Sequence, residues 1–451
     1  MKKLPLLLLL ASSTTFAGSL SNTDARSMAM GDVGVAASKP GTAGLFNPAL
    51  LSTYTDGEKI SLIFADFAGS LTANQDTFDS AEDIVDGDFG TQITDAVDLV
   101  NQLADGPVNT GTIADFGNAT SSLANITNSF NEALGNISGE ALTMSGNMLI
   151  AGARPSKDLG IGLYFNVGGT IETGLDIALC DQQLLTDFAG AIEDLTDLNN
   201  NILNNPGADI VSTCDGVDRT LIDGSTGDLQ DPDGDLSSGF IFALIQQTEV
   251  GLSLSRKFRV AGHNIAFGIT PKFITLTSHL VSPSLQDIDD ETYDLTDEFN
   301  NNEKEDSNFD IDVGVAASLL HDDSLKVGIV IKNLLAPSFD TISTATADID
   351  TTIRAGIAWS KAGFSFGADL DLVENDGFLG STKSQFAAFG GEYNLFNTLR
   401  LRGGIRSNLS ETDETALTAG IGFNIIAAHC DFALQYSNLN LGLALQLGLE
   451  F

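Results

Sequence analysis

Hydrophobic and polar residues alternate along most of this chain with a period of two. In residues 158–172 the odd positions are mostly large and apolar, and the even positions are mostly small or polar. The same alternation recurs in residues 309–319 and 441–451. Alternation over this length predicts β-strands with one apolar face.

Fourteen such segments can be followed along the chain. They begin near residues 59, 140, 158, 240, 263, 308, 325, 349, 364, 383, 399, 415, 431 and 441. Every second connection is short, and the long connections follow the first, third and fifth segments. An even number of antiparallel strands with short turns at one end and long loops at the other is typical of outer-membrane barrels. We therefore expect an all-β fold, a 14-stranded antiparallel transmembrane β-barrel at residues 58–451. The alternative, a large exported β-sandwich, fits the alternation of short and long connections less well.

The first 17 residues resemble a secretory signal peptide. Two lysines precede an apolar run from Leu4 to Ala11, and Thr15-Phe16-Ala17 places small residues where signal peptidase cleaves. That run is too short to span a bilayer as a helix. A signal peptide and a strand-built barrel together predict the outer membrane of a Gram-negative bacterium.

Acidic residues are concentrated in the three long loops. Residues 74–138, 175–239 and 282–308 hold 35 of the 61 carboxylates, and their only bases are Arg219 and Lys304. With a net charge of −40, the chain lacks the cationic face that a nucleic-acid partner requires. Helical spacing within residues 76–138 and 181–204 (for example Ile93, Val97, Val100 and Leu103) predicts helical extracellular insertions.

If the apolar strand faces meet lipid, charged residues on the other faces point into the lumen. These are five carboxylates and five bases: Asp310, Asp312, Lys332, Arg354, Asp369, Asp371, Glu392, Arg400, Arg402 and Arg406. Balanced ion pairing is the simpler interpretation, because unpaired charges in a confined lumen are costly. A selectivity stripe formed by Arg400, Arg402 and Arg406 is the alternative.

The three cysteines predict one disulfide. Cys180 and Cys214 flank the second long loop, and an exported chain permits a bond that staples this loop. Cys430 is then a free, buried thiol. Asp231, Asp233 and Asp235 have the spacing of a calcium loop, but Leu236 and Phe242 replace the expected glycine and glutamate. We expect no dedicated metal site and no cofactor beyond loosely bound Ca²⁺ or Mg²⁺.

No catalytic motif is recognisable. The sequence contains no Gly-x-Ser-x-Gly, phosphate loop or Cys-x-x-Cys, and its four histidines have no metal-ligand spacing. We therefore expect no enzymatic activity.

Residues 24–52, which precede the first strand, are rich in Gly, Ala, Met and Ser. The stretches "DARSMAMGDVGVA" and "AGLFNPALLS", followed by a first strand, resemble the opening of the TraF-like conjugal-transfer family, within the superfamily of FadL-like long-chain fatty-acid transporters. The "SGNMLIAGARPSKDLGIGLYF" hairpin and the terminal Phe451 extend the resemblance over the mature chain. The chain departs from the family at Gly31-Asp32, where two glycines are usual.

The resemblance implies that residues 18–57 fold into the lumen as a hatch. Carried over by position, the hatch and ligand residues are Met28, Met30, Leu45, Phe46, Asn47 and Pro48. Gly and Ala suit a chain in a crowded lumen, and Met adapts to irregular apolar gaps. Two functions are compatible with this organisation. One is a plugged channel for hydrophobic or amphipathic small molecules. The other is a conjugal-transfer or surface-assembly component whose acidic loops bind an unidentified protein partner.

Overall fold

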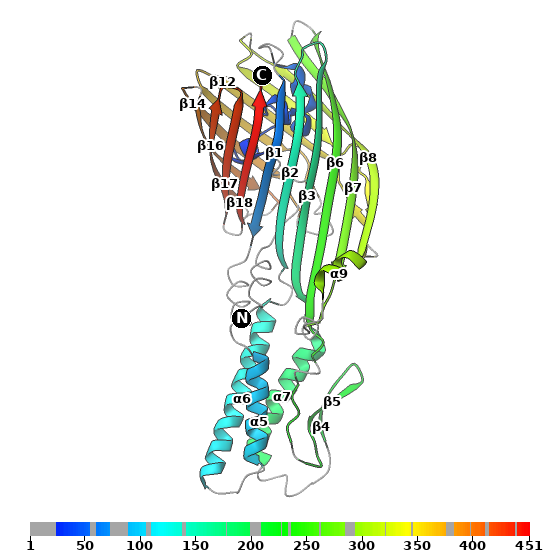
Figure 1. Ribbon diagram of the computed structural model, residues 1–451, viewed down its shortest axis with the longest axis vertical. Helices are drawn as coiled ribbons and strands as arrows, with labels where there is room; N and C mark the ends of the chain where they lie inside the picture. The colour runs from blue at the N-terminus through cyan, green and yellow to red at the C-terminus, as the bar shows by residue number, and fades with distance from the viewer. Residues whose placement is uncertain are drawn as a thin grey trace.

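The computed structural model describes residues 24–54, 60–72, 89–104, 110–137, 141–176, 178–198, 209–226, 228–232, 236–260, 263–284, 294–320, 322–343, 346–375, 383–396, 398–410, 415–437 and 440–451. The predicted signal peptide lies outside these ranges. Fourteen strands form one closed barrel (Figure 1). They are β1 (Ser61–Thr72), β2 (Ala141–Arg154), β3 (Gly160–Asp176), β6 (Gly239–Val260), β7 (His263–Val281), β8 (Glu303–Ser318), β9 (Leu325–Lys332), β12 (Thr352–Lys361), β13 (Phe364–Asp371), β14 (Phe386–Leu395), β15 (Leu399–Asn408), β16 (Thr415–Ile425), β17 (Ala428–Tyr436) and β18 (Asn440–Glu450).

The barrel strands follow one another in chain order, all antiparallel, and β1 closes the barrel by pairing with β18. The closing register sets Ser61 opposite Glu450 and Leu71 opposite Leu441. All fourteen predicted strands are present, which confirms the predicted fold class. A closed barrel leaves no open sheet edge, so every strand finds its backbone partners within the barrel.

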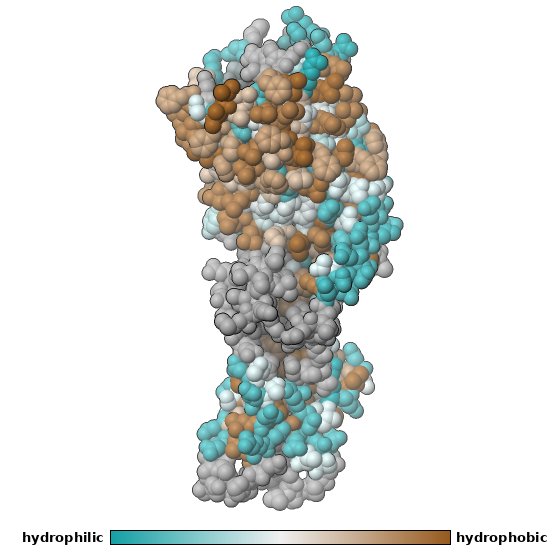
Figure 2. Space-filling view, viewed as in Figure 1, coloured by the Kyte–Doolittle hydropathy of each residue, from teal (hydrophilic) through white to brown (hydrophobic). Residues whose placement is uncertain are grey.

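Strand alternation separates an apolar outer face from a polar inner face. In β3, Leu163 is 57% exposed, whereas its neighbours Tyr164 and Asn166 are buried inside. In β8, Phe309 is 51% exposed, and Asp310 is fully buried. Figure 2 shows an apolar band across the visible face of the upper barrel. An apolar band around a closed, polar-lined barrel is that of an outer-membrane protein.

An aromatic ladder crosses the outer face of β12, β13 and β14. Trp359 stacks on Phe366 with 6.0 Å between ring centroids, and Phe366 in turn lies 6.4 Å from Phe389. Phe364 stacks on Tyr393 at 4.4 Å. Phenylalanine thus supplies most of a ladder in the position where Trp and Tyr usually dominate.

One side of the barrel wall is longer than the rest. β3, β6, β7 and β8 have 17, 22, 19 and 16 residues, whereas β9 and β12–β18 have 8 to 11. β8 begins at Glu303, inside the predicted acidic loop 282–308, because its first residues continue the ladder with β7. Figure 2 shows that this end of the wall is hydrophilic, so it projects beyond the apolar band.

The longer wall carries a small apolar cluster. The short hairpin β10 (Ser338–Asp340) and β11 (Thr346–Asp348) packs Phe339 and Ala347 against Ile274 and Leu276 of β7. The helix α9 (Leu295–Asn301) begins at Asp294, whose side chain accepts from Thr296 N and Asp297 N. These elements cover the part of the wall that lies beyond the membrane.

The first two long loops form a helical subdomain at the end of the barrel opposite the short turns (Figure 1). It contains α5 (Phe89–Ala104), α6 (Thr110–Ile137) and α7 (Leu179–Leu198), which confirms the predicted helical insertions. It also contains the hairpin β4 (Ile210–Cys214) and β5 (Val217–Ile222), which the sequence did not reveal. Within the described residues, no helix is long and apolar enough to cross a membrane.

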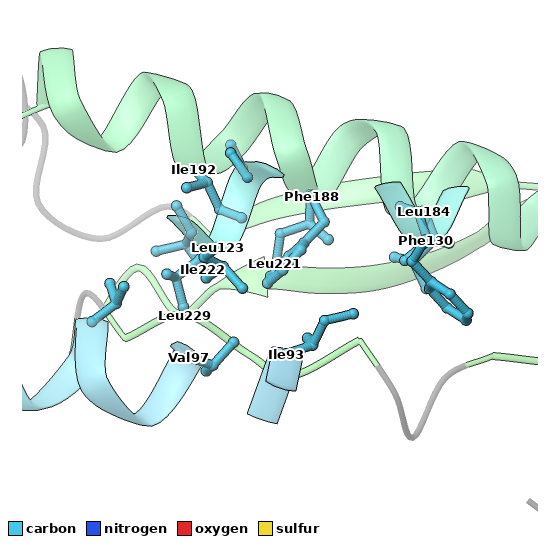
Figure 3. Packing of buried hydrophobic residues seen from close by; sticks show 14 of the residues in the cluster. Ile93, Val97, Leu123, Phe130, Leu184, Phe188, Ile192, Leu221, Ile222 and Leu229 are labelled. Carbon is cyan, nitrogen blue, oxygen red and sulfur yellow. The ribbon is translucent and has the colours of Figure 1, made fainter. Parts of the chain in front are cut away.

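This subdomain has its own hydrophobic core. Val97 of α5, Leu123 of α6 and Phe188 of α7 meet Leu221 of β5 in one buried cluster (Figure 3). The disulfide Cys180–Cys214 joins α7 to β4, with 5.5 Å between Cα atoms, and confirms the predicted pairing. The subdomain is therefore a packed unit on the barrel.

Candidate functional site: the luminal segment and the barrel wall

Residues 24–54, here called the luminal segment, lie inside the barrel. They form α2 (Ala25–Met28), α3 (Pro40–Phe46) and the 3-10 helix η1 (Pro48–Ser52). α2 contacts β16, β17 and β18, whereas η1 contacts β6, β7 and β8 across the lumen. Most of the segment is buried, including Asp24, Arg26 and Asn47. The segment therefore spans the interior from one wall to the other.

A ring of wall glycines accommodates this segment. On ten of the fourteen strands, a methyl group added to one glycine would collide with the luminal segment: Gly160, Gly268, Gly314, Gly328, Gly356, Gly367, Gly390, Gly404, Gly420 and Gly442. At Gly328, for example, the added carbon would lie 2.7 Å from the Val35 carbonyl oxygen. We call these ten residues the glycine collar. Five of these glycines face backbone atoms of the segment and five face its side chains, and the absence of a wall side chain at each lets the segment pack closely against the wall.

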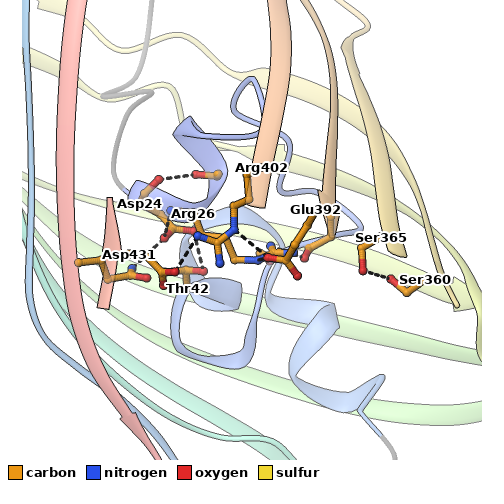
Figure 4. A network of polar contacts seen from close by, with 12 residues as sticks. Asp24, Arg26, Thr42, Ser360, Ser365, Glu392, Arg402 and Asp431 are labelled. Carbon is orange, nitrogen blue, oxygen red and sulfur yellow. Dashed lines mark hydrogen bonds and ion pairs between the residues drawn. The ribbon is translucent and has the colours of Figure 1, made fainter. Parts of the chain in front are cut away.

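Two arginines and two carboxylates fasten α2 to the wall (Figure 4). Arg26 Nε donates to Glu392 Oε2 at 3.1 Å, and Arg402 Nε donates to the same oxygen at 2.8 Å. A second nitrogen of Arg402 reaches Asp431 Oδ1 at 2.6 Å. All four side chains are at least 94% buried, so each charge relies on its partners and not on water.

The start of α2 is held separately. Asp24 caps the helix by accepting from Arg26 N at 3.1 Å, and it also accepts from Gln446 Nε2 at 2.8 Å. The same Gln446 nitrogen donates to Asp66 Oδ2 at 2.8 Å. Burial raises the pKa of Asp24. The side-chain amide of Gln446 thus donates to the carboxyl groups of both Asp24 and Asp66.

The turn after α2 contains Gly31-Asp32, where the TraF-like pattern usually has two glycines. Gly31 and Asp32 both have positive φ, 72° and 67°. An aspartate tolerates this left-handed conformation better than most residues. Its carboxylate forms an ion pair with Arg406. Asp32 therefore adopts the left-handed conformation that the turn requires and also binds the segment to β15.

The next turn of the segment is bound by Asp369. Its Oδ2 accepts from Gly34 N at 2.7 Å and from Val35 N at 2.9 Å. Asn47 Nδ2 donates to Val35 O at 3.0 Å, and Asn47 Oδ1 accepts from Ala49 N at 3.1 Å. Asn47 thereby joins the two halves of the segment and begins η1.

The predicted hatch residues are all in this segment. Met28, Met30, Leu45, Asn47 and Pro48 are buried, and Phe46 is half-buried with its ring against Gly34. Met28 packs against the wall alanines Ala68, Ala433 and Ala444. These contacts are with the wall and with the segment itself, so a ligand role for these residues remains a prediction.

Most of the predicted luminal charges are paired. Arg354 Nε meets Asp371 Oδ1 at 2.5 Å. Arg402 and Arg406 are each engaged with carboxylates, as described above, so two of the three arginines of the predicted stripe take part in ion pairs. Arg400 lines a small cavity together with Lys39 and Glu450. This arrangement favours ionic packing over a free selectivity stripe.

A second ionic cluster includes residues that the sequence analysis did not single out. Lys272 Nζ lies 2.9 Å from Asp312 Oδ1, 3.7 Å from Glu249 Oε2 and 3.9 Å from Asp310 Oδ2. Lys332 is close enough to Asp312 to interact electrostatically. Glu249 and Lys272 obey the same alternation that identified Asp310 and Asp312, so the strand pattern contained the signal.

The remaining candidate residues lie apart from the luminal segment. Asp231 accepts from Thr94 Oγ1 at 2.7 Å, whereas Asp233 and Asp235 lie outside the described residues, so the calcium-loop hypothesis stays a prediction. Cys430 is free and half-buried, not buried as predicted. It lies near the start of β17, where the strand leaves a short turn and the wall is only partly covered.

The solved structures that the chain resembles include two toluene transporters and a FadL homologue, all of low sequence identity. The Pseudomonas putida toluene transporter TodX matches with 10% identity and a TM-score of 0.43, covering 97% of this chain and 99% of its own. The Ralstonia pickettii toluene transporter TbuX has 12% identity, a TM-score of 0.36 and coverages of 96% and 99%. A Pseudomonas aeruginosa FadL homologue has 10% identity, a TM-score of 0.42 and coverages of 97% and 99%.

No curated protein matches the chain. The family model described as "F plasmid transfer operon, TraF, protein" matches residues 44–371, from α3 of the luminal segment to the end of β13. The match covers well over half of the chain. It includes part of the luminal segment and all of the helical subdomain. The chain therefore belongs to the TraF family.

Proposed function

We propose that this protein is a plugged outer-membrane channel for hydrophobic or amphipathic small molecules, with the luminal segment as its gate. The observation that supports the proposal is that a separate segment lies inside the barrel and packs against most of its strands. A barrel of fourteen strands has an interior that wall side chains alone do not fill. Here the filling is a chain held by hydrogen bonds, ion pairs and shape, with no covalent cross-link to the wall among the described residues.

The wall contacts also support a gate that moves as a unit. The collar contacts run along residues 28–35 and 47–51, through both backbone and side-chain atoms, so the fit depends on shape. The ion pairs of Arg26 and Asp32 are with β14 and β15, on one side of the barrel. A displacement of the segment would break these ion pairs together with the hydrogen bonds to Asp369 and Gln446.

Uptake of a labelled long-chain fatty acid by cells that lack their own transporter tests this proposal. We would compare the wild-type protein with the luminal variant Phe46→Ala/Asn47→Ala and with the control Phe67→Ala, whose side chain faces lipid on β1. Heat-dependent gel mobility would confirm that each variant forms a barrel.

We expect uptake above the vector control for the wild type and for Phe67→Ala, and at least fivefold slower uptake for the luminal variant. Equal uptake by all three proteins would remove the gate from the proposal. If the correctly inserted wild type takes up neither the fatty acid nor labelled toluene, the transport function is wrong.

A second candidate function is supported by the helical subdomain. Its core and disulfide make it a folded unit beyond the membrane, larger than a channel requires. In this alternative the barrel anchors an acidic surface that contacts a protein partner, as the conjugal-transfer name of the family suggests. Deletion of residues 76–138 distinguishes the two: loss of a cellular function such as conjugation, with uptake unchanged, would favour the anchoring role.

A further inference from the structure

Two buried carboxyl groups meet where the luminal segment begins. Asp24 caps α2 of the segment, and Asp66 belongs to β1 of the wall. The side-chain nitrogen of Gln446, on β18, donates to Asp24 Oδ1 and to Asp66 Oδ2, each at 2.8 Å. Two acceptors of one nitrogen are at most twice that distance apart. We call Asp24 and Asp66 the acid pair.

The arginines beside the acid pair are already engaged with other carboxylates. Arg26 and Arg402 both act on Asp24 (Figure 4). Both donate to Glu392, and Arg402 also binds Asp431. Two carboxylates thus compensate the two guanidinium groups. Within the described part of the chain, no lysine or arginine lies within ion-pair distance of either member of the acid pair.

The other charges nearby do not neutralise the acid pair. The charges that act most strongly on Asp66 are those of Asp24 and Asp431, and both are negative. Besides Arg26 and Asp431, the titratable groups that line the small cavity beside Asp24 are Lys39, Arg400, His429 and Glu450. Lys39 and Arg400 share this cavity with the two carboxylates of Asp431 and Glu450, so they add no excess of positive charge.

Both members of the acid pair are withdrawn from water. Asp24 is 1% exposed, and Asp66 is fully buried. Asp66 Oδ1 accepts no hydrogen bond from the described residues. A buried charge without a partner is costly, and two ionised carboxylates in one site repel each other. A proton retained by the pair removes one of the two charges and this repulsion.

We propose that Asp24 and Asp66 together hold one proton while the luminal segment is docked, and that release of this proton to water detaches α2 from β1 and β18. Burial raises the pKa of Asp24, and the attraction of Arg26 only partly offsets this. A released, hydrated Asp24 loses its proton at its ordinary, lower pKa. Docking is therefore favoured at low pH and weakens as the pH rises. The inference goes beyond the proposed function and holds whether the barrel transports or anchors.

Ion conductance of the purified full-length protein in planar bilayers at pH 5 and pH 9 tests this inference. Asp66→Asn keeps the shape of the side chain and an acceptor for Gln446, but it cannot ionise. Asp322→Asn is the matched control, because Asp322 is an exposed carboxylate paired with Lys361. Lys39→Arg is a second control: burial lowers the pKa of Lys39 to about 8, and arginine keeps its charge at both pH values. Heat-dependent gel mobility verifies that each variant forms a barrel.

We expect the conductance of the wild type and of both controls to rise at least fivefold from pH 5 to pH 9. Asp66→Asn should keep the low pH 5 conductance of the wild type at both pH values. Asp24→Asn, which retains the helix cap, should do the same, and it makes the test if Asp66→Asn forms no barrel.

Three results would overturn the proposal. The first is a wild-type conductance that does not change with pH. The second is an Asp66→Asn variant that keeps the pH response, or that conducts strongly at both pH values, since docking would then not depend on a proton at this pair. The third is loss of the response in Lys39→Arg, which would assign it to the lysine.

Discussion

Arg26 and Glu392 form a buried ion pair at 3.1 Å although they are 366 positions apart in the chain. Arg26 belongs to the segment inside the barrel, and Glu392 belongs to β14 of the wall. Arg402 of β15 shares the same carboxylate oxygen at 2.8 Å. The Glu392 carboxylate therefore binds both Arg26 of the luminal segment and Arg402 of the wall. Its loss should leave both guanidinium groups without this partner.

Replacing Glu392 by Gln should destabilise the protein strongly. The amide leaves Arg26 and Arg402 buried without their shared negative partner, and breaking a buried ion pair costs about 3–5 kcal/mol. The temperature at which the folded gel band converts to the unfolded band measures this loss. Asp322→Asn is the control, because its partner Lys361 is exposed and such pairs contribute about 0–1 kcal/mol. Equal shifts in the two variants would contradict the structural role of Glu392.

The glycine collar predicts that one added methyl group disturbs the closed lumen. In Gly404→Ala the new carbon collides with the backbone of Met30 and Gly31, and overpacking of this kind costs about 1–3 kcal/mol. We expect lower thermal stability and increased ion conductance in planar bilayers. Gly146→Ala on β2 is the matched control, since an added carbon there meets no atom within 4 Å. Unchanged conductance and stability in Gly404→Ala would show that the collar is not tightly packed.

Removal of the Cys180–Cys214 disulfide should affect the helical subdomain and not the barrel. A disulfide that closes a loop of this length contributes about 2–4 kcal/mol, and both cysteines lie in the subdomain. In Cys180→Ser/Cys214→Ser we expect limited proteolysis to cleave the subdomain residues 89–137 and 179–222 at least tenfold faster, with an unchanged barrel band on the gel. Loss of the barrel band would show instead that the subdomain supports barrel folding.

The strands and their order could be predicted from the sequence because the environment of each strand determines the residue pattern within that strand. Lipid outside and polar contacts inside impose an alternation that is visible at Leu163 and Asn166 or at Phe309 and Asp310. The helices of the subdomain were predictable for the same reason, since Ile93, Val97 and Val100 recur with helical spacing on α5.

The site could be predicted only in outline. Arg26 and Asp32 are in the quoted opening stretch, but nothing near them in the chain indicates Glu392 or Arg406 as partners. Such contacts depend on how the segment enters the barrel. The collar glycines appear in the sequence as ordinary small residues of the inner face, and only the fold shows that they lie around one segment.

A luminal segment that acts as a gate must move during transport, and a reversible cross-link measures this directly. A carbon added to Gly44 of α3 would lie 3.3 Å from Ser253 Cβ of β6, close to the separation in disulfides, about 3.5–4.5 Å. Uptake of the labelled fatty acid would be measured for Gly44→Cys/Ser253→Cys in a Cys430→Ala background, oxidised and reduced, with the wild type under the same reductant as control. We predict that oxidation abolishes uptake and that reduction restores it to the rate of the reduced wild type. Uptake that is equal in the oxidised and reduced variant, with the cross-link verified, would contradict the gate.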